Sequence, residues 1–278
     1  SSAASDVYKR QDKVLEIADE LPHLRWIVYN DPRGMRKYRH DRLLDRRELI
    51  ERGEAAPPDA FEAAVAAGRG DEVAMLCTTS GTTSHPKLAM LQHRPLLEHS
   101  AAYLRADPRE PTDEYVSVLP LPWIGEQMMA VSSALLFGFT VNFPEKPETA
   151  QENVREIGPH VMFSPPRVWE NLAATVQVKI MDASAFKRFV FNRCLPIGYQ
   201  WADFKFQKKT PGLGAKIAYW IAYQLVFRAL KDRLGFSNIR SASTGGAALG
   251  PDTFRFFHAL GVNLKQIYGQ TEISGISC

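Results

Sequence analysis

The chain has 278 residues, which is room for two modest domains or one large one, and 45% of its residues are hydrophobic and 23% charged. This composition is that of a globular protein and excludes a disordered chain or a fibrous repeat. The net charge of +3 is too small to indicate a nucleic-acid partner by itself. The three cysteines, Cys77, Cys194 and Cys278, are odd in number and lack metal-ligand spacing, so the sequence favours a reducing, cytoplasmic setting over a disulfide framework or a zinc site.

No segment has the roughly 20 nearly uninterrupted apolar residues that a membrane-spanning helix needs. The best candidates fall short, because 128–143 directly follows Glu126 and Gln127 and because 217–227 is only a short run. We therefore expect no transmembrane segment, and leave open a peripheral contact at the inner membrane surface. Residues 1–11 lack the charged-then-apolar layout of a secretory signal, and we expect them to be a non-native or disordered leader.

From residue 12 onward, the pattern of apolar residues predicts helices and strands in repeated alternation. Helices are expected over 12–22, 58–67, 94–106, 128–138, 151–158, 214–234 and 251–261, and strands over 24–31, 73–77, 88–91, 115–119, 140–143, 161–164, 239–243 and 262–269. This alternation predicts an α/β fold of layered sheets flanked by helices. The mixed charges of residues 33–52 are typical of a solvated helix or loop.

Two segments in the second half of the chain are open to more than one interpretation. Residues 182–209 interleave Lys and Arg with aromatic residues, which suits a stacking platform for single-stranded nucleic acid, but no recognised nucleic-acid motif accompanies them. A helical excursion whose aromatic side packs on the body is therefore favoured. The helix at 214–234 has apolar residues on more than one side and is either buried or rests on a membrane surface, with burial favoured.

The segment TTSGTTSHPK, residues Thr78 to Lys87, is the first that could carry chemistry. Such a loop can offer backbone amides, hydroxyl donors and one ammonium group, which are what phosphate oxygens require. It is not a Walker A loop, because Pro86 occupies the position of the second glycine and Leu88 follows the lysine. A standard nucleoside triphosphatase is therefore excluded.

Two further motifs lie near the end of the chain. In YGQTE, Tyr268 to Glu272, a strand delivers an aromatic ring that can stack on a base, and the glycine permits a close backbone approach. The threonine and glutamate of this motif can reach a phosphate and Mg²⁺. The segment STGGAALG, Ser243 to Gly250, is built of small residues just after an expected strand.

These three motifs, in this order, resemble those of the adenylate-forming superfamily, which comprises acyl-CoA synthetases, luciferases and the adenylation domains of peptide synthetases. The loop is similar to the family pattern TSGTTGxPKG, with Ser84 and Leu88 in place of two glycines, and YGQTE is similar to YGxTE. The segments 12–34 and PPRVWENL, together with the 182–209 excursion, resemble the long-chain acyl-CoA synthetases.

One position departs from that branch. Where its members have LPLxHxxE, this chain has LPLPWIGE, so that Trp123 replaces the histidine while Glu126 matches the acid. The resemblance implies that these two residues contribute to an acyl pocket, whose size preference Trp123 would alter.

The resemblance implies an ATP- and Mg²⁺-dependent acid–thiol ligase, in which a carboxylate attacks the α-phosphate of ATP and the thiol of CoA then displaces AMP. It gives catalytic roles to Lys87, Thr271 and Glu272, with Glu272 as the Mg²⁺ ligand. The residues it implies for ATP binding are Thr79, Ser80, Gly81, Thr82, Thr83, Lys87, Gly245, Gly246, Ala247, Tyr268, Gly269, Gln270 and Thr271. The expected partners are a fatty acid, ATP and CoA, and not a nucleic acid.

The resemblance also implies a domain organisation. Residues 12–278 correspond to part of an AMP-binding (adenylation) domain, truncated at both ends, and the small C-terminal domain of the family is absent. We therefore expect the chain alone to be inactive and the parent protein to be a long-chain fatty-acid CoA ligase. Two alternatives stay open: a fatty acyl-AMP ligase that loads a carrier protein, and a non-catalytic nucleotide-binding relic, the latter motivated by Ser84, Leu88 and Trp123.

Overall fold

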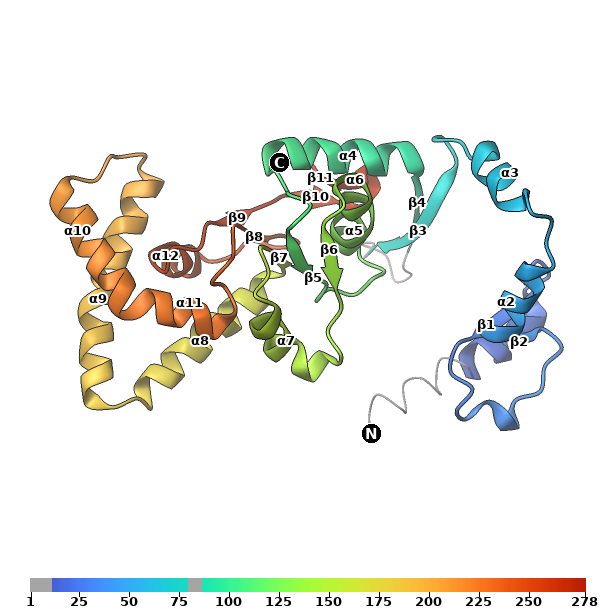
Figure 1. Ribbon diagram of the computed structural model, residues 1–278, viewed down its shortest axis with the longest axis horizontal. Helices are drawn as coiled ribbons and strands as arrows, with labels where there is room; N and C mark the ends of the chain where they lie inside the picture. The colour runs from blue at the N-terminus through green and yellow to red at the C-terminus, as the bar shows by residue number, and fades with distance from the viewer. Residues whose placement is uncertain (1–11, 80–86) are drawn as a thin grey trace. The chain divides into compact units, whose positions relative to one another are not determined.

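The computed structural model describes residues 12–79 and 87–278, and the chain divides into two compact units, Ser1–Gly68 and Arg69–Cys278 (Figure 1). In the first unit, two short parallel strands, β1 (Ile27–Tyr29) and β2 (Leu43–Asp45), pair with each other. The helical elements of this unit are a turn over residues 12–16, η1 (Ala18–Glu20), η2 (Met35–Lys37), α2 (Arg46–Glu54) and α3 (Ala60–Ala67). The helix expected at 12–22 is therefore broken, and the strand expected at 24–31 is reduced to three residues.

Helix α2 shows how local chemistry builds this first unit. Asp45 ends β2 and caps the helix, because its side chain accepts a hydrogen bond from the backbone N–H of Arg47 at 2.8 Å. No residue of α2 is buried. The mixed charges of 33–52 thus lie, in part, on a solvated helix, as predicted.

The second unit is built on a five-stranded parallel sheet. Its strand order is β6-β5-β7-β8-β9, and the strands are β5 (Glu114–Val116), β6 (Thr140–Asn142), β7 (Val161–Ser164), β8 (Ser241–Thr244) and β9 (Leu264–Gln266). Every residue of β7 and β8 is buried, as expected for central parallel strands covered on both faces. The predicted α/β class, with a sheet between helices, is confirmed.

Side chains alternate along β7 between two hydrophobic clusters, one on each face of the sheet. Met162 belongs to a cluster around Trp169, Phe227 and Phe257. The helices of that face are α7 (Ala150–Ile157), α8 (Pro166–Met181), α9 (Ala185–Phe206), α10 (Leu213–Ala222), α11 (Arg228–Leu234) and α12 (Pro251–Ala259). The short turn η4 (Pro147–Thr149) leads into α7, and the π-helical segment η5 (Tyr223–Phe227) joins α10 to α11.

Val161 and Phe163 point to the other cluster, which includes Tyr115 and Met128. This face carries α4 (His93–Ala106) and the helical run α5 (Ile124–Glu126), η3 (Gln127–Ser133) and α6 (Ala134–Phe137). The buried helix expected at 128–138 is buried only at its start, because Leu135 in α6 is 78% exposed.

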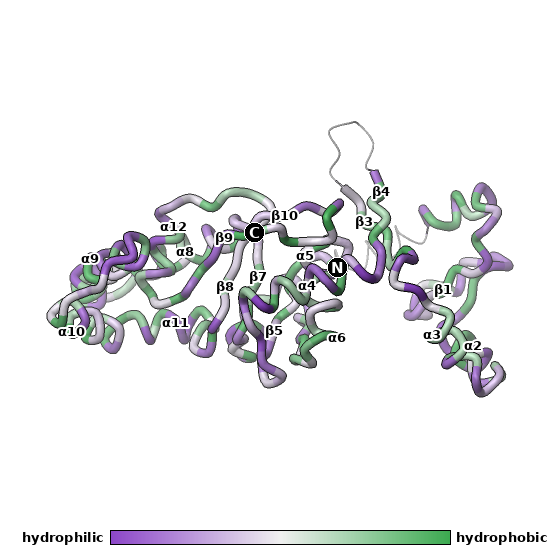
Figure 2. Tube along the Cα trace, turned by 90° about the horizontal axis from the view of Figure 1, so that it is seen from above, coloured by the Kyte–Doolittle hydropathy of each residue, from purple (hydrophilic) through white to green (hydrophobic). Residues whose placement is uncertain are grey.

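The excursion at 182–209 is helical, as predicted. Helix α9 packs closely on its neighbours at Gly198, where a Cβ atom would stand 2.7 Å from Phe227 Cζ and 2.9 Å from Ala259 Cβ. The ring of Trp201 stacks on that of Tyr219 from α10, with centroids 4.4 Å apart. Apolar and hydrophilic residues alternate along these helices (Figure 2), and the burial favoured for 214–234 is wrong for one side of α10.

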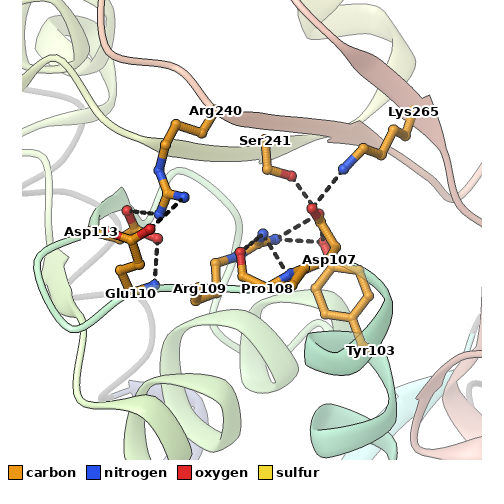
Figure 3. A network of polar contacts seen from close by, with 9 residues as sticks. All are labelled: Tyr103, Asp107, Pro108, Arg109, Glu110, Asp113, Arg240, Ser241 and Lys265. Carbon is orange, nitrogen blue, oxygen red and sulfur yellow. Dashed lines mark hydrogen bonds and ion pairs between the residues drawn. The ribbon is translucent and has the colours of Figure 1, made fainter.

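A network of charged side chains joins α4 to the amino ends of the strands (Figure 3). Asp107, directly after α4, accepts hydrogen bonds from Arg109, from Ser241 at the start of β8 and, at 2.6 Å, from Lys265 of β9. Arg240 pairs with Asp113 in the same network. Burial alone would raise the pKa of Asp107, but the hydrogen bonds from Arg109, Lys265 and Ser241 hold that pKa well below its usual range.

We predict that Asp107→Asn lowers the free energy of unfolding at pH 7 by about 3 kcal/mol, because it leaves the Arg109 guanidinium buried without its counter-charge. The depressed native pKa means that this stability is fully present above the unfolded pKa, about 3.9, and is lost as the pH falls below it. The difference between wild type and variant in urea unfolding should therefore shrink on acidification. Asp182→Asn, at an exposed carboxylate, is the control, and an equal loss in both variants would contradict the role of the network.

Candidate functional site

The first motif lies on an antiparallel hairpin formed by β3 (Val73–Thr79) and β4 (Lys87–Gln92). Thr79 and Lys87 are the last paired residues of this hairpin, so the two strands bring the ends of the loop together. The Lys87 side chain is exposed, and Thr79 is half-buried. The expected phosphate-binding residues Ser80, Gly81, Thr82 and Thr83 lie outside the described residues.

The second motif follows the carboxyl end of β8. Gly245 is buried, and a Cβ atom there would stand 2.9 Å from Ile267 Cγ1, so a larger residue would displace the chain after β9. Gly246 has φ of +85°, a left-handed conformation that favours glycine. Ala247 is exposed, and its carbonyl oxygen accepts a hydrogen bond from Gln266 Nε2 at 3.2 Å.

The third motif follows β9 and forms a small hairpin of its own. Strand β9 ends at Gln266, earlier than predicted, and β10 (Gly269–Gln270) then pairs antiparallel with β11 (Gly275–Ile276). The turn between them is η6 (Thr271–Ile273). A Cβ atom at Gly269 would collide with the carbonyl group of Gly275, so the close approach that this glycine permits is to the backbone of β11.

The side chains of YGQTE are largely open to solvent. Tyr268 is 57% exposed, and its hydroxyl accepts a hydrogen bond from Gln270 Nε2 at 2.9 Å. Thr271 is half-buried, and Glu272 is exposed. The backbone of Tyr268 is fixed by hydrogen bonds to residues 277 and 278, including one from Ser277 N to the Tyr268 carbonyl at 2.8 Å.

The motifs converge at one edge of the sheet. Strand β4 packs against η6, which brings the strand that begins with Lys87 against the turn that holds Thr271 and Glu272. Strand β11 packs against α4 and α5. The segment 245–247 lies against the connection that leads from β9 into the β10–β11 hairpin, because Gly245 is close to Ile267. Ligands of open α/β sheets bind at the carboxyl ends of the strands, which is where these segments lie.

Trp123 and Glu126, both expected at an acyl pocket, lie in different environments. Trp123 is 52% exposed, whereas Glu126 is completely buried and accepts a hydrogen bond from the hydroxyl of Tyr115 at 2.9 Å. Burial raises the pKa of Glu126, and the hydroxyls of Ser117 and Tyr115 lower it by a smaller amount. Burial together with the neighbouring Glu126 also raises the pKa of Tyr115.

Tyr115 was not among the residues expected at the site. Its position at the start of a strand marks it only as a core aromatic. The sequence holds one hint of its role: a glutamate in an apolar segment, such as Glu126, needs a buried hydrogen-bond donor. The sequence does not indicate which strand supplies that donor.

The arrangement fits a bound magnesium nucleotide. No cluster of three His, Cys, Asp or Glu that could hold a metal by itself exists within residues 12–79 and 87–278. Mg²⁺ is commonly bound by one or two carboxylates together with substrate phosphates, and the exposed carboxylate of Glu272 meets that need. The ammonium group of Lys87 suits phosphate oxygens.

Residues 6–278 match the family described as AMP-binding enzyme. The chain belongs to the AMP-binding enzyme family. This membership covers both units of the fold and all three motifs.

Curated relatives of the chain are fatty-acid ligases by name. It is 29% identical over 276 residues to the long-chain-fatty-acid–CoA ligase ACSBG2 of Xenopus laevis, a match that covers 96% of this chain and 36% of that protein. It is 31% identical over 212 residues to the long-chain-fatty-acid–CoA ligase heimdall of Drosophila melanogaster, which covers 74% of this chain and 31% of that protein. The chain thus spans about a third of the length of these relatives.

Solved structures show the same fold. The A-PCP didomain of a carboxylic acid reductase from Segniliparus rugosus, in complex with AMP, is 25% identical with a TM-score of 0.54, over 82% of this chain and 28% of that one. VinN in complex with L-aspartate has a TM-score of 0.55 at 17% identity, over 94% of this chain and 54% of that one. The second likeness concerns the fold alone.

We predict that Glu126→Gln stabilises the protein increasingly as the pH rises. Because the native pKa of Glu126 is raised, the folded state holds its proton more tightly than the unfolded state, and ionisation costs native stability above the ordinary glutamate pKa of about 4.3. Calorimetric melting temperatures of wild type and variant should therefore be similar near pH 4 and diverge in favour of the variant toward pH 8. The exposed Glu145→Gln serves as control, and a difference for Glu126→Gln that is constant with pH would show that Glu126 ionises freely.

Proposed function

We propose that a protein containing this chain is an ATP- and Mg²⁺-dependent ligase that joins a carboxylic acid, a long-chain fatty acid, to CoA. The observation that carries the proposal is the packing of β4 against η6, which sets the strand of Lys87 against the turn of Thr271 and Glu272. Family membership supports adenylation chemistry, and the names of the curated relatives support the acid and the thiol.

The nucleotide would lie across the carboxyl edge of the sheet. The phosphates would be bound by Lys87 and by the hydroxyls and backbone amides of Thr79, Ser80, Gly81, Thr82 and Thr83. The ring of Tyr268 would stack on adenine, and the segment 245–247 with Gly269 and Gln270 would line the nucleotide. Tyr268 suits this role because its ring is open to solvent while its backbone is fixed.

In the first step, a carboxylate oxygen of the acid attacks the α-phosphorus of ATP and pyrophosphate leaves. Thr271 would donate its hydroxyl to an oxygen of the α-phosphate, and Lys87 would offset the charge of the leaving pyrophosphate. Glu272 would hold Mg²⁺, which neutralises phosphate charge when it is bound. In the second step the CoA thiolate attacks the acyl carbonyl and AMP leaves. The contribution of the protein is positioning and electrostatic stabilisation.

The acid would approach on the side of α5. Trp123, at the start of this helix, is exposed and can contact the acid directly. Glu126 cannot do so as it stands, because it is buried against Tyr115. We therefore assign Glu126 to the positioning of α5 and Trp123 to the shape of the acyl pocket.

The free thiols of Cys77, Cys194 and Cys278 support a reducing compartment such as the cytoplasm.

Calorimetric titration of the chain with ATP tests the nucleotide site. Binding is expected in the presence of Mg²⁺, and Lys87→Ala should weaken it about 10- to 100-fold, the usual range for one charged hydrogen bond. Glu272→Gln should weaken binding of Mg²⁺–ATP and leave binding of ATP without Mg²⁺ unchanged. The exposed Lys146→Ala is the matched control.

Two results would contradict the proposed roles. Unchanged affinity in Lys87→Ala would remove that residue from the phosphate site, and equal weakening of Glu272→Gln with and without Mg²⁺ would exclude the metal role. Absence of ATP binding by a chain whose circular dichroism shows it to be folded would mean either that further segments of the full-length protein are indispensable for binding or that the site is a non-catalytic relic, and ATP binding by the full-length protein would separate the two.

A further inference from the structure

A row of large apolar side chains is exposed along α10 and η5. It consists of Leu213, Ile217, Trp220, Ile221 and Leu225, whose exposed fractions lie between 46% and 75%. Leu213, Ile217, Ile221 and Leu225 recur every four residues, and Trp220 lies three residues after Ile217, which places the set on one side of the helix. We call this set the apolar stripe. The opposite side of the helix is packed, because Tyr219 stacks on Trp201 and Phe227 is completely buried.

Lysines accompany the apolar stripe. Lys208 and Lys209 lie in the connection before α10, and Lys216 lies one helical turn before Trp220. All three side chains are exposed, and none takes part in an ion pair within the described residues. The surrounding segment 178–233 contains eleven Lys and Arg, three Asp and no Glu, whereas the whole chain carries only +3. Positive charge is thus concentrated in the segment that contains the stripe, and the rest of the chain is net acidic.

We propose that the apolar stripe, with Lys208, Lys209 and Lys216, docks on a bilayer that contains anionic phospholipids. An amphipathic helix of this kind lies in the plane of the interface, with its apolar side at the boundary of headgroups and acyl chains. Trp220 suits that boundary, and lysine side chains reach the lipid phosphates while their methylene groups stay in apolar surroundings. No helix of the described part of the chain is long and apolar enough to cross a membrane, so the contact is with the surface.

A nucleic acid is a poorer occupant of this surface. Within 182–209, Trp201 stacks on Tyr219, Phe206 packs against His258 and Phe191 is buried, so only part of the aromatic set, including the exposed Phe186 and Phe189, is open to stacking on bases. Four of the five residues of the apolar stripe are aliphatic and offer no π face. Aliphatic side chains favour hydrocarbon, and the lysines then require an anionic headgroup.

A second copy of the chain also fits less well. In a symmetric dimer the same patch is used by both copies, so two surfaces that carry the same positive charge would be brought together. Such like-charge contacts are unfavourable across an interface. A bilayer with anionic lipid supplies both the apolar medium and the opposite charge.

Vesicle flotation of the 278-residue chain tests this proposal without any nucleotide or acid, so its outcome is separate from that of the proposed function. We expect binding to vesicles of phosphatidylcholine with phosphatidylserine, and much weaker binding to phosphatidylcholine alone. Replacement of all three lysines by Gln should lower partitioning onto the anionic vesicles about 100-fold, at roughly fivefold per charge. The double variant Ile217→Gln/Ile221→Gln should lower it about tenfold. Leu135→Gln, which removes an exposed leucine from α6, should have no effect.

Three results would overturn the proposal. The first is no preference of the wild-type chain for anionic vesicles. The second is equal loss of binding in Leu135→Gln and in the double isoleucine variant. The third is that vesicle binding does not depend on the apolar stripe and its lysines, whereas self-association of the chain or binding of a single-stranded oligonucleotide does. Circular dichroism of each variant checks that the fold is retained. We expect it to be retained, because the substituted positions are exposed.

Discussion

Parallel pairing of β5, β7, β8 and β9 determines where the candidate site lies. Parallel strands end at the same edge, so segments that are distant in sequence but follow neighbouring strands are delivered to one place. The segment with Trp123 and Glu126 follows β5, the glycine segment follows β8, and YGQTE follows β9. The β3–β4 hairpin joins them through its contact with η6 and through Ile124 of α5, which packs on the cluster of Cys77 and Leu91.

Polar contacts at the opposite edge, where the strands begin, hold β8 and β9 in place against α4. There the Asp107 carboxylate links α4 to both β8 and β9, through Ser241 and Lys265. Arg109 is buried beneath it and donates hydrogen bonds to the Tyr103 hydroxyl and to Asp107, while its Nε has no partner among the described residues. Charges fix the amino ends of the strands, and the carboxyl ends are followed by glycines and by exposed polar side chains.

The sequence predicts the fold class and the motifs because both are local signals. The alternation of helices and strands follows from periodicity, and the order of the three motifs is visible without a structure. The pairing of Tyr115 with Glu126 is not predictable in this way, because it depends on how a strand and a helix turn toward each other across the core. The early end of β9 is set by the pairing of β10 with β11, which depends on two glycines, Gly269 and Gly275, six residues apart.

Whether a given face of a helix is buried depends on the elements packed around it, and the sequence predicts this property least well. Apolar residues surround the helix at 214–234, which favours burial on all sides, yet the side with Tyr219 and Phe227 is the one that meets α9 and α12. A helix whose apolar residues exceed what its neighbours can cover must leave some of them exposed. Ile217 and Trp220 are exposed for this reason, and the sequence cannot indicate which side it will be.

Two exposed charges near the carboxyl ends of the strands limit the kind of ligand that the candidate site can bind. Lys87 and Glu272 have opposite charges and lie on elements that pack against each other, yet no ion pair joins them. Both stay exposed, and each is free to meet a ligand. A ligand that satisfies both must present negative charge to the ammonium group and positive charge to the carboxylate. A polyphosphate with a bound divalent cation does both at once, and a simple anion or an uncharged metabolite does not.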